Sequence, residues 1–374
     1  MLDEFKFTLK RMRKSPLSIV GIVIVSFFVV IAILAPVLAP PVDPRDPYAI
    51  FHDGYGPTPR PPGSPILDSF ILSTGWKVHY FGTAEGQLDI YYGCIWGART
   101  AFRIGVLVVA ISLVAGLVLG SISGYFGGVI DEILMRFTDI ILAFPGLILA
   151  MALVIALPRL WPIEFGVIGI VAASFIVPMV IGFFYPKLRG KRAVILGFAI
   201  VVAFAIPYVY VLGSPPIYTI ALDLNSLDKV LIALALVGWP GYTRVIRGEI
   251  LRIKQEDYVE AARAIGASDI RIIVRHILPN AIYPVVIMAS LDIGSTVLLA
   301  AALSFLGIGS PLGYSDWGQM ISYARNWVWT GFENPWQFWY TFIIPGVFIF
   351  IFVLGWNLLG DAFRDILDPT LRRK

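Results

Sequence analysis

Long stretches without a charged side chain constrain this sequence more than any other feature. Residues 15–42, 104–130, 165–186 and 334–360 contain no Asp, Glu, Lys or Arg. A transmembrane helix needs about 20 mainly apolar residues, so each stretch is long enough to cross a bilayer. Hydrophobic residues make up 58% of the chain and charged residues 14%, against roughly 45–50% and about 25% in average soluble domains. The sequence therefore predicts an integral membrane protein built from α-helices.

The same composition excludes other classes of protein. Cys94 is the only cysteine, which excludes a disulfide-stabilised secreted domain, and the apolar content is too high for a disordered chain. A net charge of +4 does not require a nucleic-acid partner, and none is expected. The apolar run Leu17–Pro41 follows four basic residues, as in a signal peptide, but exceeds the roughly 7–15 residues of a cleavable apolar region. We therefore expect it to remain as the first membrane helix.

Charged residues at the ends of the apolar runs delimit eight candidate membrane helices. With a cytoplasmic N-terminus, 21 of the 29 Lys and Arg residues fall on the cytoplasmic side, as the positive-inside rule favours. We therefore predict a polytopic helix bundle with both termini in the cytoplasm. The predicted spans are Pro16–Pro40, Ile104–Phe126, Ile140–Leu157, Gly166–Tyr185, Val194–Gly213, Lys229–Tyr242, Pro284–Gly307 and Phe338–Leu359.

Two segments are too long to be simple connections between spans. Residues 42–98 are predicted to lie outside the membrane, and their many prolines favour extended and turn structure because proline fixes the backbone and removes a hydrogen-bond donor. Residues 243–283 are predicted to lie in the cytoplasm. The predicted organisation is an N-terminal segment with the first helix (1–41), the outer loop (42–98) and a core domain (99–374).

The cytoplasmic segment has the pattern of two short helices joined at a glycine. Apolar residues at helical spacing predict an amphipathic helix that ends at Gly266, because glycine adopts a left-handed conformation without steric cost. Ser268 offers an N-cap for a second helix over Asp269–Leu278, which Pro279 is predicted to break. Such an element can act as a lever that docks another protein, although an ordinary solvated connector has the same pattern. The apolar stripe comprises Ile250, Ile253, Tyr258, Ala261, Ala262 and Ile265.

One carboxylate lies inside a predicted membrane helix. Asp292 has apolar neighbours, and an ionisable side chain within the membrane is by default a functional candidate. Trp239, Ser295 and Thr296 join it as candidates for lining a translocation path. The alternative is structural, because Asp292 would equally pair with a polar group inside the bundle, and small polar residues also pack membrane helices.

Motifs for catalysis and for metal binding are absent from the sequence. The phosphate-binding pattern G-x-x-x-x-G-K-S/T is missing, since the single Gly-Lys pair, Gly190-Lys191, is followed by arginine. His52, His79 and His276 lack the histidine four residues away that a zinc protease needs. We therefore expect no catalytic residue, cofactor or metal in this chain.

The cytoplasmic segment resembles a known family. Glu260-Ala261-Ala262, Gly266 and Leu278-Pro279 are spaced as in the EAA motif of the permease subunits of binding-protein-dependent ABC importers of bacteria and archaea. His276 stands where the motif has isoleucine, and in the dipeptide and oligopeptide branch this position is commonly histidine within a run like R-H-I-L-P-N. Further stretches that resemble the second permease of peptide importers are residues 238–251, 302–309, 316–318 and 357–372.

The resemblance covers most of the chain, with two departures. Residues 82–89 resemble the family pattern G-T-D-x-x-G-R-D but lack several of its residues. Members of this branch typically have six membrane helices, so residues 158–228 are predicted to be an insertion that adds two. The insertion is expected to be a helical hairpin packed at the edge of the core, and a regulatory or lipid-contacting role is the alternative.

The resemblance implies ATP-driven import across a prokaryotic cytoplasmic membrane by a bundle of the type I ABC importer permease kind. The loop helices would dock in a groove of a cytoplasmic ATPase subunit, so that closure around ATP rocks the membrane helices between inward-open and outward-open states. The implied partners are a second, related permease, two ATPase subunits that bind ATP and Mg²⁺, and an extracytoplasmic substrate-binding protein. The residues assigned to ATPase docking are Glu260, Ala261, Ala262, Ala264, Gly266, Ala267, Ser268 and Pro279.

The transported solute is expected to be a dipeptide or oligopeptide, with nickel and oligosaccharides as alternatives within the same branch. An autonomous secondary transporter or channel is the alternative of another class, but internal repeats and several intramembrane ionisable residues would then be expected. A membrane enzyme would need a catalytic constellation, which the sequence lacks.

Overall fold

The computed structural model describes residues 16–164, 219–328 and 336–367. These residues belong to two compact units, one within residues 157–225 and a larger one formed by the chain on either side of that segment. The elements of the larger unit are α2 (Pro16–Leu38), β1 (Ser64–Pro65), α3 (Ser69–Ser73), β2 (Val78–His79), the 3₁₀ turn η1 (Glu85–Gln87), α4 (Ile90–Phe126), α5 (Gly128–Ala143), α6 (Gly146–Ala156), α9 (Ser226–Ile253), α10 (Asp257–Ala264), α11 (Asp269–Ile272), the π turn η3 (Ile273–Ile277), α12 (Leu278–Ala281), α13 (Tyr283–Phe305), α14 (Trp317–Ala324) and α15 (Tyr340–Leu367).

Five of these helices are long and apolar enough to cross a membrane. They are α2, α4, α9, α13 and α15, and the bent pair of α5 and α6 raises the number of candidate spans in the described residues to six. This confirms the predicted helical membrane bundle, and five of the predicted spans fall on these five helices. The predicted spans Gly166–Tyr185 and Val194–Gly213 lie outside the described residues, so the total of eight stays a prediction.

The predicted span Ile140–Leu157 is wrong as a single straight helix. α5 ends at Ala143, α6 begins at Gly146, and their axes are bent by 95°. Pro145 explains the break, because a proline disfavours helical backbone in the residue before it. Phe144 accordingly has the extended angles φ −86° and ψ 140°.

Glycines spaced four residues apart in α4 allow this helix to pack closely against α9. Gly116, Gly120 and Gly124 lie on one face, because four residues is about one helical turn. A Cβ atom at Gly116 would lie 2.3 Å from the Cβ of Tyr242, and one at Gly120 would lie 2.7 Å from the carbonyl oxygen of Thr243. Small residues at this spacing let membrane helices approach backbone to backbone, which fixes their register.

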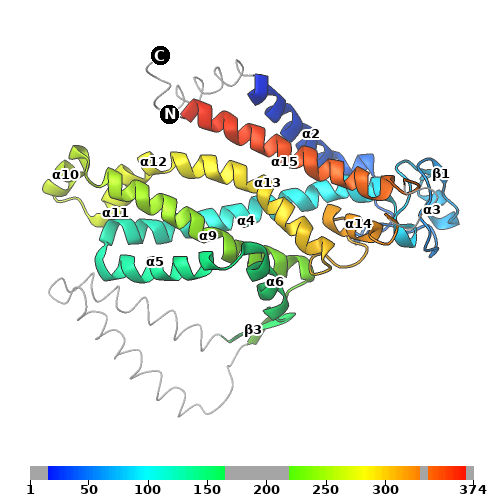
Figure 1. Cartoon of the computed structure of the whole chain (residues 1–374), viewed down its shortest axis with the longest axis horizontal. Helices are drawn as coiled ribbons and strands as arrows, with labels where there is room; N and C mark the ends of the chain where they lie inside the picture. The colour runs from blue at the N-terminus through cyan, green and yellow to red at the C-terminus, as the bar shows by residue number, and fades with distance from the viewer. Residues whose placement is uncertain (1–15, 165–218, 329–335, 368–374) are drawn as a thin grey trace, which may run out of the picture. The chain divides into compact units, whose positions relative to one another are not determined.

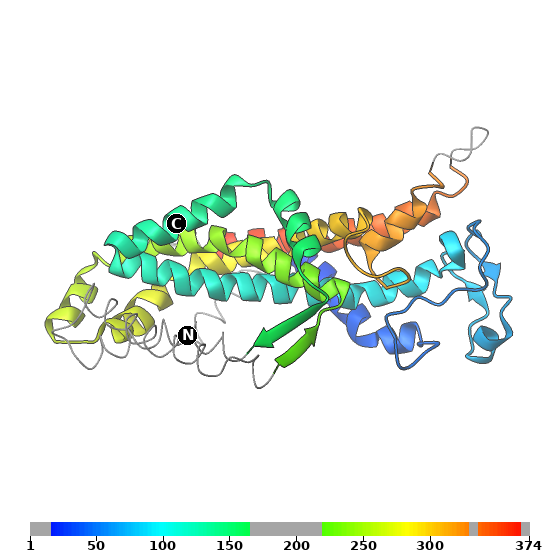
Figure 2. The ribbon, with the colours of Figure 1, turned by 90° about the horizontal axis from the view of Figure 1, so that it is seen from below.

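The remaining long helices pack in sequence on this pair. α13 contacts α4, α15 contacts α13, and α2 contacts α15. Figures 1 and 2 place α10 at one end of the larger unit and α3 and β1 at the other. α4 has 37 residues and is therefore about 55 Å long at 1.5 Å per residue, which exceeds the ~30 Å hydrocarbon core of a bilayer. This helix connects the two ends.

The outer segment 42–98 contains the predicted extended and turn structure, but its last residues are helical. β1 pairs with β2 in antiparallel register, with Ser64 opposite His79. α4 begins at Ile90, well before the predicted span start at Ile104. The side chain of Asp89 accounts for this start, because it accepts a hydrogen bond from the Tyr92 N–H (2.7 Å) as an N-cap.

The smaller unit contains a two-stranded ribbon that an all-α prediction did not include. β3 (Leu160–Glu164) pairs with β4 (Thr219–Asp223) in antiparallel register, with Leu160 opposite Asp223. The predicted insertion 158–228 covers nearly the same residues as this unit. Its two predicted helices lie between the strands and outside the described residues, so its assignment as an inserted helical hairpin stays a prediction.

Candidate functional site

The segment after α9, here called the docking element (residues 257–281), contains two short helices joined by a left-handed glycine. Gly266 has φ +83°, the conformation predicted for it. Its N–H donates to the carbonyl of Arg263 (3.0 Å), and the N–H of Ala267 donates to the carbonyl of Ala262 (3.1 Å). This pair of bonds is the Schellman arrangement that ends a helix. The angle between α10 and α11 is thus set by backbone geometry.

The first predicted helix of this segment is interrupted. α9 ends at Ile253 and α10 begins at Asp257, so the apolar stripe predicted across both does not stay on one face. Val259 and Ala262 are the buried residues of α10, whereas Ile265 is 86% exposed. Because the helix is interrupted, residues before and after the break no longer share one face. The spacing of apolar residues in the sequence does not reveal such a break.

Pro279 does not end the second helix, contrary to the prediction. The Leu278 N–H donates to the carbonyl of Ile273, five residues earlier, and α12 continues to Ala281. In a regular α-helix the proline ring would clash with the carbonyl of Arg275, and the wider π turn relieves that clash. Ser268 occupies the predicted N-cap position without a capping hydrogen bond from its side chain.

Hydrogen bonds attach the docking element and the turn that precedes it to the end of α4, and others hold the element itself together. The hydroxyl of Tyr125 donates to Asp269 Oδ1 (2.8 Å), and the Lys254 ammonium donates to the backbone carbonyl of Tyr125 (2.5 Å). The side-chain amide of Asn280 bonds both the hydroxyl of Tyr258 (3.2 Å) and the carbonyl of His276 (2.9 Å). Sequence reasoning did not predict these bonds, because nothing in the pattern marks which polar groups meet.

The predicted docking residues lie mainly on the surface of this element. Ala262 is buried and Ala267 is half-buried, while the other six are exposed. Two further apolar side chains lie exposed beyond the elbow, Ile270 (61%) and Val274 (59%). Their spacing of four residues places them on one helical face, a signal that the sequence already carried. The six exposed docking residues are Glu260, Ala261, Ala264, Gly266, Ser268 and Pro279.

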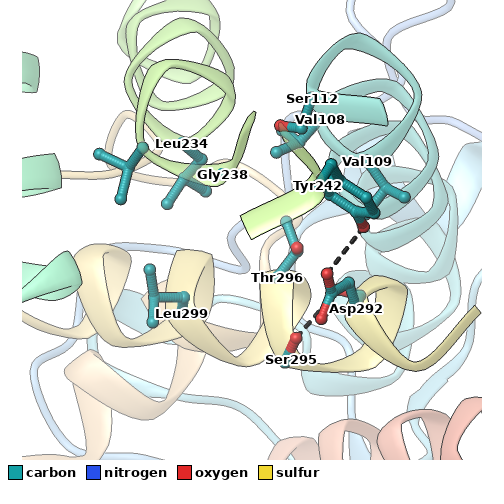
Figure 3. A pocket seen from close by; sticks show the side chains of 11 residues that line it. Val108, Val109, Ser112, Leu234, Gly238, Tyr242, Asp292, Ser295, Thr296 and Leu299 are labelled. Carbon is teal, nitrogen blue, oxygen red and sulfur yellow. Dashed lines mark hydrogen bonds between the residues drawn. The ribbon is translucent and has the colours of Figure 1, made fainter. Parts of the chain in front are cut away.

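A cavity of about 180 Å³ lies between α4, α9 and α13 (Figure 3). Three of the four residues predicted for a translocation path line it, namely Asp292, Ser295 and Thr296. The Tyr242 hydroxyl donates to Asp292 Oδ2 (2.7 Å), and the Ser295 hydroxyl donates to the backbone carbonyl of Asp292 (3.1 Å). The carboxylate of α13 is thus bonded to a side chain of α9 in the lining of the cavity.

The fourth predicted residue, Trp239, does not line this cavity. Its ring is buried and stacks on Phe137 of α5, with ring centroids 5.8 Å apart. Sequence reasoning missed Ser112, Gly238 and Tyr242, which do line the cavity. Position on a single helix does not reveal them, because they become neighbours through the α4–α9 contact.

Comparison with known proteins decides the family. Residues 116–373 match the family model described as "binding-protein-dependent transport system inner membrane component". This chain belongs to that family. Residues 5–56 of this inner membrane component also match the N-terminal transmembrane domain of oligopeptide transport permease C. The resemblance stated from the motifs is therefore confirmed.

Similar proteins cover nearly the whole of this inner membrane component. The dipeptide transport system permease protein DppC of Alkalihalophilus pseudofirmus is 31% identical over 99% of this chain and 91% of its own length. The probable D,D-dipeptide transport system permease protein DdpC of Escherichia coli is 31% identical over 96% and 89%. The oligopeptide transport system permease protein OppC of Bacillus subtilis is 27% identical over 100% and 92%.

An ion pair fastens α9 of this inner membrane component to α5. Arg247 bonds Asp131 through two parallel contacts, Nε to Oδ1 (2.5 Å) and Nη2 to Oδ2 (2.6 Å). Ser123 of α4 donates to the same carboxylate (2.5 Å), and Arg244 pairs with Asp139 farther along α5. α9 leads directly to the docking element, so these bonds link that element to the bent pair of helices.

Removing the Arg247–Asp131 ion pair is expected to lower the free energy of unfolding of the chain measurably. The side chains of Arg247 and Asp131 are only 32% and 19% exposed, so Arg247→Ala is expected to cost about 1.5–3 kcal/mol, the range for hydrogen bonds to charged groups. Arg136→Ala is the matched control, because Arg136 and Glu132 are 75% and 60% exposed and such pairs contribute about 0–1 kcal/mol. Thermal unfolding in detergent measures the change in unfolding temperature for both variants. Equal changes would contradict a stabilising role of the Arg247–Asp131 ion pair.

A buried polar network organises the outer segment. His79 is fully buried, with Nδ1 2.6 Å from Asp89 Oδ2 and Nε2 3.3 Å from Asp53 Oδ2. Arg60 pairs with Asp53 from the other side (2.6 Å). Burial raises the pKa of Asp89. Burial also acts to raise the pKa of Asp53, but hydrogen bonds from two backbone N–H groups, His79 and Arg60 hold that pKa below its usual value.

The departure from the family pattern at residues 82–89 has a structural counterpart at Gln87. Gln87 has φ +59° and is the only non-glycine residue with positive φ in the described chain. It stands where the pattern G-T-D-x-x-G-R-D has glycine. Its side-chain amide donates to the carbonyls of Gly56 (3.1 Å) and Thr58 (2.5 Å), and Arg60 donates to its oxygen. These bonds offset the strain that a side chain adds in the left-handed region.

Cys94 provides a reporter of the integrity of this outer network. Its thiol is fully buried in the second turn of α4, so we expect it to resist a membrane-impermeant maleimide. His79→Ala leaves two buried carboxylates without their shared partner, which costs about 3–5 kcal/mol when a buried pair is broken. The rate at which the maleimide labels Cys94 is therefore expected to rise at least about tenfold. A tenfold rise requires a loss of only about 1.4 kcal/mol in the free energy that keeps Cys94 buried.

His52→Ala serves as the control for this measurement. The His52 imidazole is exposed and contacts the carbonyl of Gly54 (3.2 Å), so its loss should leave Cys94 protected. Protection of Cys94 in both variants would show that His79 does not hold the outer segment together.

Proposed function

We propose that this chain is the permease subunit of an ATP-driven importer of dipeptides or oligopeptides. The observation that carries the proposal is the docking element, which presents Ile265, Ile270 and Val274 to solvent on helices fixed by a glycine elbow. Apolar side chains that lie exposed on a polar segment predicted to be cytoplasmic indicate a contact surface for another protein. An ATPase subunit that grips this surface would move α9 and, through its bonds, α4 and α5.

The proposed assembly contains more chains than this one. A second, related permease would complete the translocation path, two cytoplasmic ATPase subunits would bind ATP and Mg²⁺, and a substrate-binding protein would deliver the solute from outside. This chain would supply no catalytic group. The chain would lie in the cytoplasmic membrane of a prokaryotic cell, and the positive-inside distribution of Lys and Arg favours a cytoplasmic position for both of its termini.

The peptide substrate is supported by the names of similar proteins. Those described above are named as dipeptide, D,D-dipeptide and oligopeptide permease proteins. A glutathione transport system permease protein, GsiD of Pectobacterium atrosepticum, is also 30% identical over 79% of this chain. All four names denote short peptides or a peptide-like thiol, which favours peptides over nickel or oligosaccharides.

The proposal is tested by purifying the tagged chain from its native membrane in mild detergent and identifying the co-purifying chains. The complex is then reconstituted in proteoliposomes with its binding protein and labelled dipeptide. We expect a second permease, ATPase subunits, and uptake that requires ATP. Recovery of the chain alone, with uptake that proceeds without ATP, would instead establish an autonomous carrier.

A further inference from the structure

Among the residues that the structure describes, the lining of the cavity between α4, α9 and α13 has one acidic side chain and no basic one. Asp292 lies in the middle of α13, and the residues that line the cavity include no Lys, Arg or His. The group shown to bond the Asp292 carboxylate is the hydroxyl of Tyr242, a neighbouring residue of the lining, at 2.7 Å (Figure 3). Hydroxyls of Ser112, Ser295 and Thr296 lie around the same space.

A charged carboxylate in this position is energetically unfavourable unless a cation accompanies it. Ionisable groups within the membrane pair with opposite charge or face a polar path, because apolar surroundings disfavour an isolated charge. One neutral hydroxyl supplies a hydrogen bond but no compensating charge. The basic residues of α9 nearest in sequence to Tyr242, Arg244 and Arg247, are already paired with Asp139 and Asp131 of α5. The cavity is therefore complementary to a small cationic group that enters from outside the chain.

We propose that Asp292 receives the ammonium group of the transported solute while it passes through the bundle. This inference rests on the proposed function and specifies it: the solute is a peptide whose amino terminus is free. The Tyr242 hydroxyl holds the empty carboxylate, and the incoming ammonium takes over that acceptor oxygen. An ammonium group offers three donors, which suit the carboxylate together with the hydroxyls of Ser112, Ser295 or Thr296.

The chemistry of the cavity argues against the other solutes of this class. Imidazole nitrogen is a ligand suited to nickel, and no histidine is found among the described residues that line the cavity. Sugars are bound largely through aromatic faces and many hydrogen bonds, whereas Tyr242 is the one aromatic residue in the lining. A single carboxylate opposite a hydroxyl selects for one positive charge.

The test uses the reconstituted complex in nanodiscs with ATP bound and hydrolysis blocked, without the binding protein. Equilibrium dialysis measures binding of labelled Gly-Phe and of N-acetyl-Gly-Phe, which differ in the charge of the amino terminus. We expect the wild-type complex to bind Gly-Phe at least about tenfold more tightly, equivalent to 1.4 kcal/mol. Asp292→Asn is expected to abolish that preference while retaining the shape of the side chain.

Two further variants separate ammonium binding from a structural role. Tyr242→Phe removes the competing hydrogen bond but keeps the charge, so the preference for Gly-Phe should persist and strengthen two- to threefold. If Asp292 only ties α13 to α9, Tyr242→Phe, which removes that hydrogen bond, will abolish the preference for Gly-Phe, whereas Asp292→Asn, which keeps an acceptor oxygen, will retain it. Asp361→Asn, which neutralises an exposed carboxylate near the end of α15, is the control for charge removal and should keep the wild-type preference.

The outcomes distinguish this inference from the proposed function. ATP-dependent uptake by the wild-type complex in proteoliposomes tests the proposed function on its own. If uptake occurs but the wild-type complex shows no preference for Gly-Phe, or Asp292→Asn retains it, the inference is overturned and the importer remains. If uptake is absent with every solute, the proposed function fails first.

Discussion

Replacing Gly116 by leucine is expected to prevent the chain from folding into a stable bundle. Even a Cβ atom at this position would lie 2.3 Å from the Cβ of Tyr242 and 3.0 Å from the backbone nitrogen of Thr243. Neither neighbour is the free end of a flexible side chain, so α4 and α9 would have to separate. Overpacking in a well-packed core typically costs about 1–3 kcal/mol, and backbone separation along a whole helix seam should exceed that range.

The measurement for Gly116→Leu is the yield of monodisperse protein in mild detergent, which we expect to fall below one tenth of wild type. Gly248→Leu is the matched control. Gly248 lies in α9, where a Cβ atom would meet nothing within 4 Å, and leucine has the higher helix propensity. Normal yield for Gly116→Leu would show that the α4–α9 contact is looser than described. Loss of yield in both variants would show that any bulky residue disrupts insertion.

Gly266→Pro is expected to uncouple ATP hydrolysis from transport in a chain that still inserts and folds. Proline fixes φ near −65°, so it cannot adopt the +83° found here, and it lacks the N–H that bonds the carbonyl of Arg263. The elbow between α10 and α11 must then rearrange. We expect ATP-dependent uptake to fall at least about tenfold, which requires a loss of only 1.4 kcal/mol in the productive contact.

Gly266→Asn is the control, because asparagine tolerates the left-handed region and nothing lies within 4 Å of the Cβ position. Glu260→Lys tests the same contact through charge rather than shape, since Glu260 is exposed on α10. We expect it to reduce uptake as Gly266→Pro does. Substrate-stimulated ATPase activity at the wild-type level in both Gly266→Pro and Glu260→Lys would contradict the assignment of the docking element.

The sequence predicted the membrane helices well because their signal is local. A run of apolar residues bounded by charges by itself indicates a membrane-spanning helix, and five predicted spans fall on helices of the described chain. The failure at Ile140–Leu157 was also local, since Pro145 was visible but its bend was not anticipated. The left-handed Gly266 was predictable because few other residues take that conformation.

The cavity and the outer network were predicted less well because they depend on contacts between distant segments. Asp292 was identified as an ionisable residue in an apolar helix, but its partner Tyr242 lies in another helix and has no marker of its own. His79 appeared only as an unsuitable metal ligand, and its neighbours Asp53 and Asp89 are brought together by the fold. Trp239 was assigned to the path by residue type, and packing against Phe137 placed it elsewhere.

The length of α4 has a mechanical consequence. Its first turn is capped by Asp89 of the outer network, and near its last turn Tyr125 is bonded to Asp269 of the docking element. A tilt of about 5° around one end of a helix about 55 Å long moves the other end by about 5 Å. A small rotation of α4 at the docking element thus becomes a displacement of side-chain size at residues 42–89, the segment that precedes α4. In this arrangement the motion is transmitted along one continuous helix, and the bending stiffness of α4 determines how much of the displacement reaches its other end.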